Sequence, residues 1–344
     1  MRNNRILVSV VVAALLVLGA CGSDEPEAAT DAVPTPTEEP KCPLTGLDAP
    51  STGEVDRPAI AVKVENNSVA YPLSGLEDAE IVFEELVEGG LTRLMAIYHC
   101  TDSKKIGPIR SARIVDPAIQ SPITLIQANA GGNAIVRKAL DKADIVTIDE
   151  DAAGNAMRRV ERPGISMEHT LYGNSVALRK IGQKKFDEPP ASELFTFGDP
   201  PAGGKKVKTL TLHFSAAGNI GYRWNGSQWL RSDGGEPLMA ESGGQIAVDN
   251  VIIEQHTINY SRQIVDAAGN PSVDIADAIG SGAAILFRDG KMFRGKWSRK
   301  TLDDPVVYTT KSGEPLVLNP GVTWIELLPD QKGELKGSFE TSKK

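Results

Sequence analysis

The chain has 344 residues, 24% of them charged, and a formal net charge of −8 at pH 7. This acidic balance argues against nucleic-acid binding and against a broad attraction to anionic lipid, because both depend on clustered positive charge. The length leaves room for two folded domains.

The N-terminal segment has the features of a bacterial lipoprotein signal peptide. Arg2 and Arg5 give a positive start, and residues 6–18 form an uncharged apolar run. This run is shorter than the roughly 20 residues that a membrane-spanning helix needs, so it is typical of a cleaved signal. It ends in Leu-Gly-Ala directly before Cys21, which resembles the bacterial lipobox. We expect residues 1–20 to be removed and Cys21 to carry lipid; an ordinary signal peptide with a chance cysteine is the alternative.

Residues 21–41 are predicted to be a disordered tether between this lipid and the folded part. The segment is rich in Pro, Ala, Thr and acidic residues and has no aromatic residue. It therefore cannot bury enough apolar surface to offset the entropy of ordering. Loss of residues 1–20 removes two arginines and no acid, so the mature chain carries −10. We expect an exported protein held by its lipid on the outer face of the cell membrane.

Two cysteines remain once Cys21 is assigned to lipid. In an oxidising compartment, Cys42 and Cys100 most simply form one disulfide, and two buried free thiols are the alternative. Neither cysteine has a second ligand at the close spacing of zinc sites. The sequence therefore predicts no metal site and no cofactor.

The first folded region, residues 42–186, is predicted to be an α/β domain. Strand-like runs occupy residues 59–64 and 123–128. A helix-like segment at 134–140 and a further strand at 145–148 complete a strand–helix–strand order.

Residues 81–88 and 91–98 read as two strands around a Gly-Gly loop, which predicts a β-hairpin. The first run could instead be helical. A two-residue loop would place Leu86 opposite Arg93 and Glu84 opposite Met95.

In that pairing Glu84, Glu88 and Arg93 share one face, close enough for long side chains to meet. The group is either a structural ion-pair cluster or a polar site in which a carboxylate serves as acid or base. A glycosidase would need two carboxyl groups at a defined separation, which the sequence does not give.

The second half of the chain has a different character. Residues 187–205 form a turn-rich linker, and 333–344 form a polar tail. Between them, residues 206–332 carry short strand-like runs separated by Asn-Gly, Asp-Gly and Ser-Gly turns, which predict an all-β sandwich or barrel. The overall fold class is therefore α+β, an α/β domain followed by a mainly antiparallel β domain. Four tryptophans in the β domain serve either core packing or stacking on sugar rings: Trp224, Trp229, Trp297 and Trp324.

The densest polar cluster is the stretch Gly-Pro-Ile-Arg-Ser-Ala-Arg at residues 107–113. Arg110 and Arg113 would face one way if Ser111 began a helical turn. Paired guanidinium groups suit carboxylate or phosphate, and a helix N-terminus would add backbone donors. The alternative is that both arginines pair with acids of the same fold.

His169 lies in a polar, loop-like stretch and joins Glu84 and Glu88 as a candidate catalytic residue. Ser111 and His169 could form a nucleophile pair, but no Gly-x-Ser-x-Gly elbow surrounds the serine. No pair of histidines has the spacing of a metal site.

Several segments resemble the YerB lipoprotein family over nearly all of the chain after the tether. They are Pro43-Leu44-Thr45-Gly46, Arg57-Pro58, Asn66-Asn67, Glu84, Glu88-Gly89-Gly90-Leu91-Thr92-Arg93 and residues 107–113, then Asn250-Val251-Ile252-Ile253, Asp289-Gly290-Lys291, Gly295-Lys296-Trp297 and Pro320-Gly321-Val322-Thr323-Trp324. The resemblance implies a two-domain lipoprotein of unknown function, with no established reaction, cofactor or catalytic residue. It suggests that the hairpin and the Arg-Ser-Ala-Arg loop form a shared polar centre. The chain departs from the family pattern at His169-Thr170, where members typically read His-Asn.

These features favour a non-enzymatic envelope protein that binds wall material or a wall-synthesis protein. Its membrane partner is the bilayer that holds its lipid, and its wall ligand would be peptidoglycan or another anionic polymer. The candidate ligand-binding residues are Asn66, Arg93, Arg110, Ser111 and Arg113. The alternative is an enzyme on peptidoglycan glycan or peptide, with Glu84 or Glu88 as general acid or base. A substrate-binding lipoprotein of a transporter is a third, weaker reading.

Overall fold

The computed structural model describes residues 39–216, 218–266 and 269–343. Cys21, the predicted signal peptide and the tether up to residue 38 lie outside the described residues. No helix within the described ranges has the length and apolarity that a membrane crossing requires.

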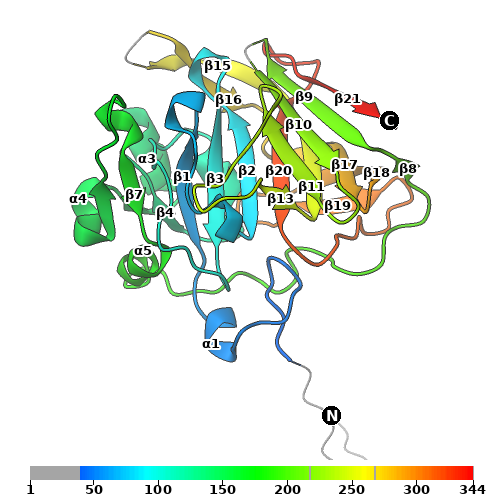
Figure 1. Cartoon of the computed structure of the whole chain (residues 1–344), viewed down its shortest axis with the longest axis horizontal. Helices are drawn as coiled ribbons and strands as arrows, with labels where there is room; N and C mark the ends of the chain where they lie inside the picture. The colour runs from blue at the N-terminus through cyan, green and yellow to red at the C-terminus, as the bar shows by residue number, and fades with distance from the viewer. Residues whose placement is uncertain (1–38, 217, 267–268, 344) are drawn as a thin grey trace, which may run out of the picture. The chain divides into compact units, whose positions relative to one another are not determined.

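An 11-stranded sheet connects the two halves of the described sequence (Figure 1). In spatial order its strands are β19 (Val307–Thr310), β18 (Lys291–Arg299), β17 (Gly280–Arg288), β14 (Asn250–His256), β20 (Thr323–Pro329), β2 (Ile81–Leu86), β3 (Thr92–Tyr98), β1 (Ile60–Asn66), β4 (Ile126–Ala128) and β5 (Val146–Ile148), with β8 (Lys205–Lys206) beside β18.

Strand β20 joins the halves because it pairs in parallel with strands of both. Thr323 lies opposite Asn250 of β14 on one side and opposite Ile81 of β2 on the other. The segments 42–186 and 206–332, expected as separate domains, therefore share one hydrogen-bonded sheet.

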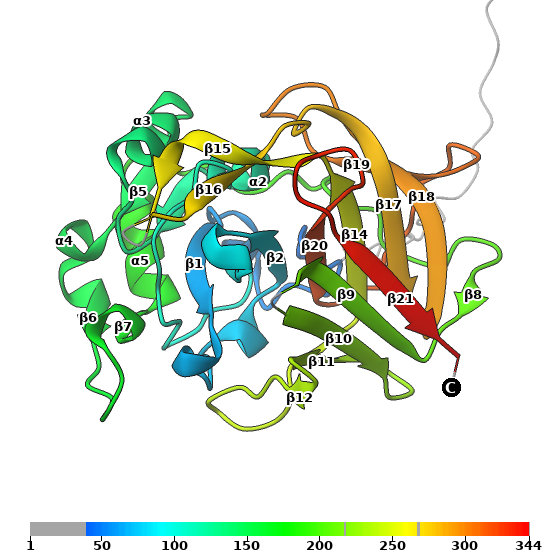
Figure 2. The same ribbon diagram turned by 90° about the horizontal axis from the view of Figure 1, so that it is seen from above.

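A six-stranded sheet from the second half packs on one face of the large sheet (Figure 2). Its strands are β12 (Glu236–Pro237), β11 (Trp229–Asp233), β10 (Gly218–Trp224), β9 (Thr209–Ser215), β21 (Ser338–Ser342) and β13 (Ala247–Val248). The fully buried Trp229 meets Phe287 edge to face, with ring centroids 5.8 Å apart. Trp297 and Trp324 are also buried, so these three tryptophans serve packing and form no exposed platform for sugars. Strand β21 lies in the predicted polar tail.

Helices α3 (Ala134–Lys142), α4 (Glu150–Ala153) and α5 (Ser175–Gly182) contact the β1–β4–β5 end, where the chain runs strand, helix, strand as expected. The described residues also form α1 (Thr52–Val55), α2 (Asp116–Gln120) and short 3₁₀ turns at Ser68–Ala70, Leu76–Asp78, Glu88–Gly90, Gly154–Ala156 and Met167–His169. Helix α3 begins where the Asn133 side chain accepts hydrogen bonds from Ile135 N and Val136 N. Its buried Val136 and Leu140 lie four residues apart, on one face. Together with the mostly antiparallel sheets, this arrangement confirms the α+β prediction.

Two smaller sheets complete the fold. Strands β6 (Met157–Arg159) and β7 (Leu171–Gly173) pair beside the helices, and β15 (Ile258–Val265) pairs with β16 (Pro271–Ile275). The β15–β16 hairpin reaches across to α3, where Ile264 packs on Val136 and Leu140 (Figure 2).

The predicted hairpin of β2 and β3 exists, but the predicted register is wrong. The turn is a three-residue 3₁₀ segment, Glu88–Gly90, and Glu85 rather than Leu86 lies opposite Arg93. Side chains alternate between the faces of a strand, so a one-residue shift moves each of them to the other face. Glu84 and Arg93 therefore point to opposite sides of the sheet.

Cys42 and Cys100 form the predicted disulfide, with Cα atoms 6.1 Å apart. The bond closes a separation of 58 residues and fixes the start of the folded region to the segment after β3.

Candidate functional site

A cleft of about 600 Å³ lies where the ends of β1 and β3 meet the loop of residues 107–115, the start of α3 and the β15–β16 hairpin. Most of the predicted ligand-binding and catalytic residues line it, namely Asn66, Glu88, Arg93, Arg110, Ser111 and Arg113. We call this space the arginine cleft.

The loop that carries Arg110 and Arg113 is extended and not helical. Backbone bonds hold it between neighbours, from Arg110 N to Lys63 O at 2.9 Å and from Ala112 N to Gly131 O at 2.9 Å. Ser111 therefore begins no helical turn, contrary to expectation. The extended backbone nevertheless brings both arginines to the same cleft.

A buried polar chain behind the cleft anchors this loop. The Asp116 carboxylate accepts from Arg113 N at 2.9 Å and from Gln127 Nε2 at 2.6 Å. Lys63 Nζ, fully buried, lies 2.9 Å from Asp116 and 2.5 Å from Glu85. Breaking one link would leave a buried charge without its partner, so the loop is held firmly in place.

Arg113 is paired with Glu88 at the cleft wall. Its Nε and Nη2 lie 2.9 and 2.5 Å from Glu88 Oε2, while Ser272 donates to Glu88 Oε1 at 2.7 Å. Burial alone would raise the pKa of Glu88, but Arg113 and Ser272 outweigh it and hold that pKa below its usual value. Glu88 is thus a bound carboxylate and a poor proton donor at neutral pH.

Arg110 and His169 share a different acid, Glu65 of β1. Glu65 Oε1 lies 3.4 Å from Arg110 Nε, and Glu65 Oε2 lies 2.7 Å from His169 Nδ1. Arg110 also donates to the backbone oxygen of Glu168 at 2.8 Å. His169 is therefore tied to the cleft wall through Glu65.

Arg93 differs from the other two arginines because it forms no ion pair, although Glu65 and Glu85 lie opposite it on the neighbouring strands. Its guanidinium donates to Ser111 O at 3.0 Å, and its buried Nε has no hydrogen-bond partner. Among the described residues no carboxylate oxygen lies within 4.0 Å of it, although Arg93 is only 8% exposed. Burial, together with the nearby Arg113 and Arg110, lowers its pKa, and the smaller opposing effects of Glu88 and Glu85 do not offset this. An anion entering the cleft would supply the missing counter-charge.

Glu84 does not belong to the arginine cleft. It is fully buried on the opposite face of the sheet, where its Oε2 lies 2.5 Å from Arg231 Nη2. Asn66 Nδ2 donates to Glu84 Oε1 at 3.0 Å, so the Asn66 amide serves this interior cluster although the residue also borders the cleft. Glu84 and Glu88 therefore do not flank a common space as two glycosidase carboxyls would.

Sequence reasoning missed Glu65, Ser272 and Ile264, all of which border the cleft. One signal for Glu65 was available, because Lys63 and Glu65 are charged residues inside an otherwise apolar strand. Such residues are rarely buried without partners. Ser272 and Ile264 come from the β15–β16 hairpin, and no local sequence pattern predicted that this hairpin would line the cleft.

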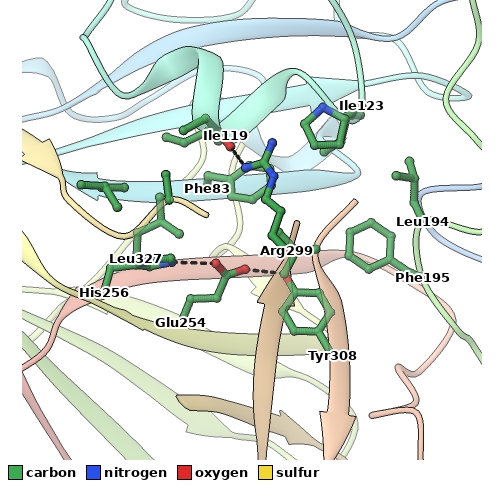
Figure 3. A pocket seen from close by; sticks show the side chains of 15 residues that line it. Phe83, Ile119, Ile123, Leu194, Phe195, Glu254, His256, Arg299, Tyr308 and Leu327 are labelled. Atoms are coloured by element: carbon green, nitrogen blue, oxygen red, sulfur yellow. Dashed lines mark hydrogen bonds and ion pairs between the residues drawn. The ribbon is translucent and has the colours of Figure 1, made fainter. Parts of the chain in front are cut away.

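A second, smaller pocket of about 40 Å³ lies between α2 and the β14, β18 and β19 strands (Figure 3). Its lining is mainly apolar, with Phe83, Ile119, Ile123, Leu194, Phe195 and Leu327 around it. At one side Glu254 accepts from the Tyr308 hydroxyl and lies 2.9 Å from His256 Nε2, while Asp277 lies 3.2 Å from His256 Nδ1. Burial opposes the charge on His256, but the two acids raise its pKa to about 9. The pocket is little larger than the space of a few waters, and its ionic groups already have partners.

One group of possible metal ligands occurs among the described residues, made of the buried Glu80, His99 and Cys100. The Cys100 sulfur is already bound to Cys42. Glu80 Oε1 accepts from the backbone N–H groups of His99 and Thr101 at 3.0 and 2.7 Å, so the group is explained as part of the core.

Comparisons with known proteins agree with this architecture. Residues 44–188 match the model described as "Protein of unknown function (DUF3048) N-terminal domain", and residues 210–325 match its C-terminal counterpart. The chain is 28% identical over 311 residues to "Putative lipoprotein YerB" of Bacillus subtilis, covering 87% of this chain and 89% of that protein. It also resembles the crystal structure of the YerB protein from Bacillus subtilis, with a TM-score of 0.70 and 24% identity over 88% of this chain and 100% of that one. The chain therefore belongs to the family of YerB-like proteins, which are built from an N-terminal and a C-terminal DUF3048 domain.

Proposed function

We propose that this protein is a lipid-anchored envelope protein that binds an anionic group of wall material in the arginine cleft and assists envelope assembly without chemistry of its own. The lipobox-like sequence before Cys21 supports the anchor, as does the lipoprotein name of the Bacillus subtilis relative. The outer face of the cell membrane is the location that such an anchor would give.

The observation that carries the proposal is Arg93. Burying a guanidinium without an opposite charge costs roughly several kcal/mol of desolvation free energy, as it does for other buried ions. Arg113 and Arg110 form ion pairs with Glu88 and Glu65, whereas Arg93 lines the cleft and forms no ion pair. Selection for stability alone would favour an apolar side chain there, so the charge is best explained by a ligand.

The enzymatic alternative has less support from this geometry. Glu88 is held as a carboxylate by Arg113, and Glu84 lies sealed on the other face of the sheet. A general acid needs a proton near neutral pH and access to substrate. Neither acid offers both, so binding is the function that these residues support best.

The test is co-sedimentation of the soluble form that begins at Glu39 with purified cell-wall sacculi. We would compare the wild type with Arg93→Gln and with the Arg110→Ala/Arg113→Ala double variant, each checked for a native circular-dichroism spectrum. Arg223→Gln is the matched control, because it removes one exposed arginine of β10 that does not line the cleft.

Binding by the wild type and the control, and its loss in the cleft variants, is the expected result. Sacculus binding that is equal in all four proteins would contradict a role for the cleft. Absence of binding in every protein would reject wall material as the direct ligand and direct the search to wall-synthesis proteins.

A further inference from the structure

The arginine cleft adjoins a second cavity, and the two together offer room for an elongated ligand. The second cavity has a volume of about 140 Å³ and lies between the β2–β3 turn and the ends of β9 and β10. Four residues border both spaces, namely Asn66, Asn67, Leu91 and Thr92. The two cavities therefore meet at these four residues, and we call them together the groove, with Arg93 in the first cavity and Leu91 at the junction.

The charges along this groove suit a ligand with a single negative charge. Arg93 is the arginine of the cleft that forms no ion pair, while Glu65, Glu88 and Asp266 are acids that line the same cleft. Asp233 lines the second cavity. A polyanion lying along the groove would pair once with Arg93, and its further charges would find Arg110 and Arg113 already paired with Glu65 and Glu88.

The remainder of the groove suits a small, partly apolar chain. Leu91 is 44% exposed at the junction, and Phe214 and Ile220 line the second cavity. Thr92 and Asn67 add polar groups beside them. This alternation of apolar and hydrogen-bonding surface matches a peptide backbone with small side chains better than it matches a sugar phosphate.

We infer that the groove captures the free C-terminal carboxylate of a short peptide with small apolar side chains, with the carboxylate at Arg93 and the preceding residues along Leu91. Capture of a peptide carboxylate by a prearranged cationic group is a known mode of recognition. A guanidinium also fits a carboxylate with two parallel hydrogen bonds. This inference rests on the proposed function, because it specifies the ligand of the same cleft.

Isothermal titration of the form that begins at Glu39 tests the inference with three probes. They are an alanine tripeptide with a free carboxylate, the same tripeptide as its C-terminal amide, and an oligomer of glycerol phosphate. We expect the acid to bind and the amide to bind at least about tenfold more weakly, since loss of a charged hydrogen-bonded pair is worth roughly 1.4 kcal/mol or more. Arg93→Gln should lose binding of the acid.

A second variant keeps the test valid if Arg93→Gln folds poorly. Leu91→Glu changes an exposed side chain at the junction of the two cavities, so it should fold normally and weaken binding of the acid about tenfold. Arg223→Gln should bind as the wild type does.

The outcomes separate the inference from the proposed function. Equal binding of acid and amide, or tighter binding of the glycerol phosphate oligomer, would overturn the peptide inference and leave an anion-binding cleft. The same holds if no soluble probe binds while sacculi still bind through Arg93. Failure of both the probes and the sacculi would reject the inference and the proposed function together.

Discussion

Arg93 of β3 and Arg231 of β11 lie against opposite faces of the large sheet, and the two buried arginines have different surroundings. Arg231 is fully buried and lies 2.5 Å from Glu84, with its guanidinium also above the Trp324 ring at 4.8 Å. Arg93 is almost as buried, but among the described residues it forms no ion pair and has no aromatic ring against its guanidinium. Both leave Nε without a hydrogen bond, so the carboxylate is what separates them.

The pKa values of the two groups move in opposite directions. Burial disfavours the charge of both, but Glu84 and its neighbours raise the pKa of Arg231 above its ordinary value. Burial and the nearby arginines lower that of Arg93. A sealed charge in an ion pair is part of the architecture, whereas a buried charge that lines a cavity without an ion pair is a candidate for ligand binding. Four predictions follow from this difference, from the largest expected effect to the smallest.

Replacing Arg231 should destabilise the protein strongly. Arg231→Met leaves Glu84 charged and unpaired in the interior, which costs about 3–5 kcal/mol. Urea unfolding of the form that begins at Glu39 measures this loss. The exposed Arg223→Met should change the free energy of unfolding by no more than about 0.5 kcal/mol. Similar values for the two variants would mean that the interior pair is not a compensated charge.

Charged His256, paired with Glu254 and Asp277, should stabilise the fold as Arg231 does, and the size of this stabilisation should depend on pH. Its pKa is raised to about 9, so the charged form stabilises the fold fully below the unfolded value near 6.5. This stabilisation, about 3 kcal/mol, is lost as pH rises through 9. The stability gap between wild type and His256→Gln should therefore shrink between pH 6 and pH 9.5. A gap that grows or stays constant would contradict the charged assignment.

Replacing Arg93 should have the opposite sign from replacing Arg231. Arg93→Met removes a buried charge that forms no ion pair, so the free energy of unfolding should stay unchanged or rise by about 1 kcal/mol. Binding to sacculi should be lost in the same variant. Paired measurement of unfolding and co-sedimentation checks both. A loss of stability near that of Arg231→Met would remove the contrast between the two clusters.

The smallest expected effect is that of Glu88→Gln. The change weakens the pair with Arg113 and leaves a second cation free in the cleft, at a cost of about 1 kcal/mol or less. Anionic probes should then bind more tightly, most of all those with several charges. Titration with the glycerol phosphate oligomer measures the gain, and weaker binding of this probe would show that Glu88 itself contacts the ligand.

Local patterns predicted the elements well because they depend on neighbours in the chain. Alternation and turn residues located β1, β3 and β5 to within about two residues, and the helix-like pattern from residue 134 located the start of α3. The Gly-Gly sequence also marked the hairpin. This sequence did not give the register of the hairpin, because Glu88 joins the two glycines in a three-residue turn. The one extra turn residue places Glu84 and Arg93 on opposite faces of the sheet.

By itself the sequence determined the lipoprotein-like leader, the α+β class and the Cys42–Cys100 disulfide, and it singled out Arg93, Arg110 and Arg113 as candidate residues. Those features follow from residue type and spacing along the chain. The tertiary structure decided which acid meets which arginine, because Glu65, Glu88 and Glu84 reach their partners through strand register and long-range packing. It also decided that β20 fuses the two halves into one sheet, since parallel pairing between distant strands depends on contacts that no local pattern contains.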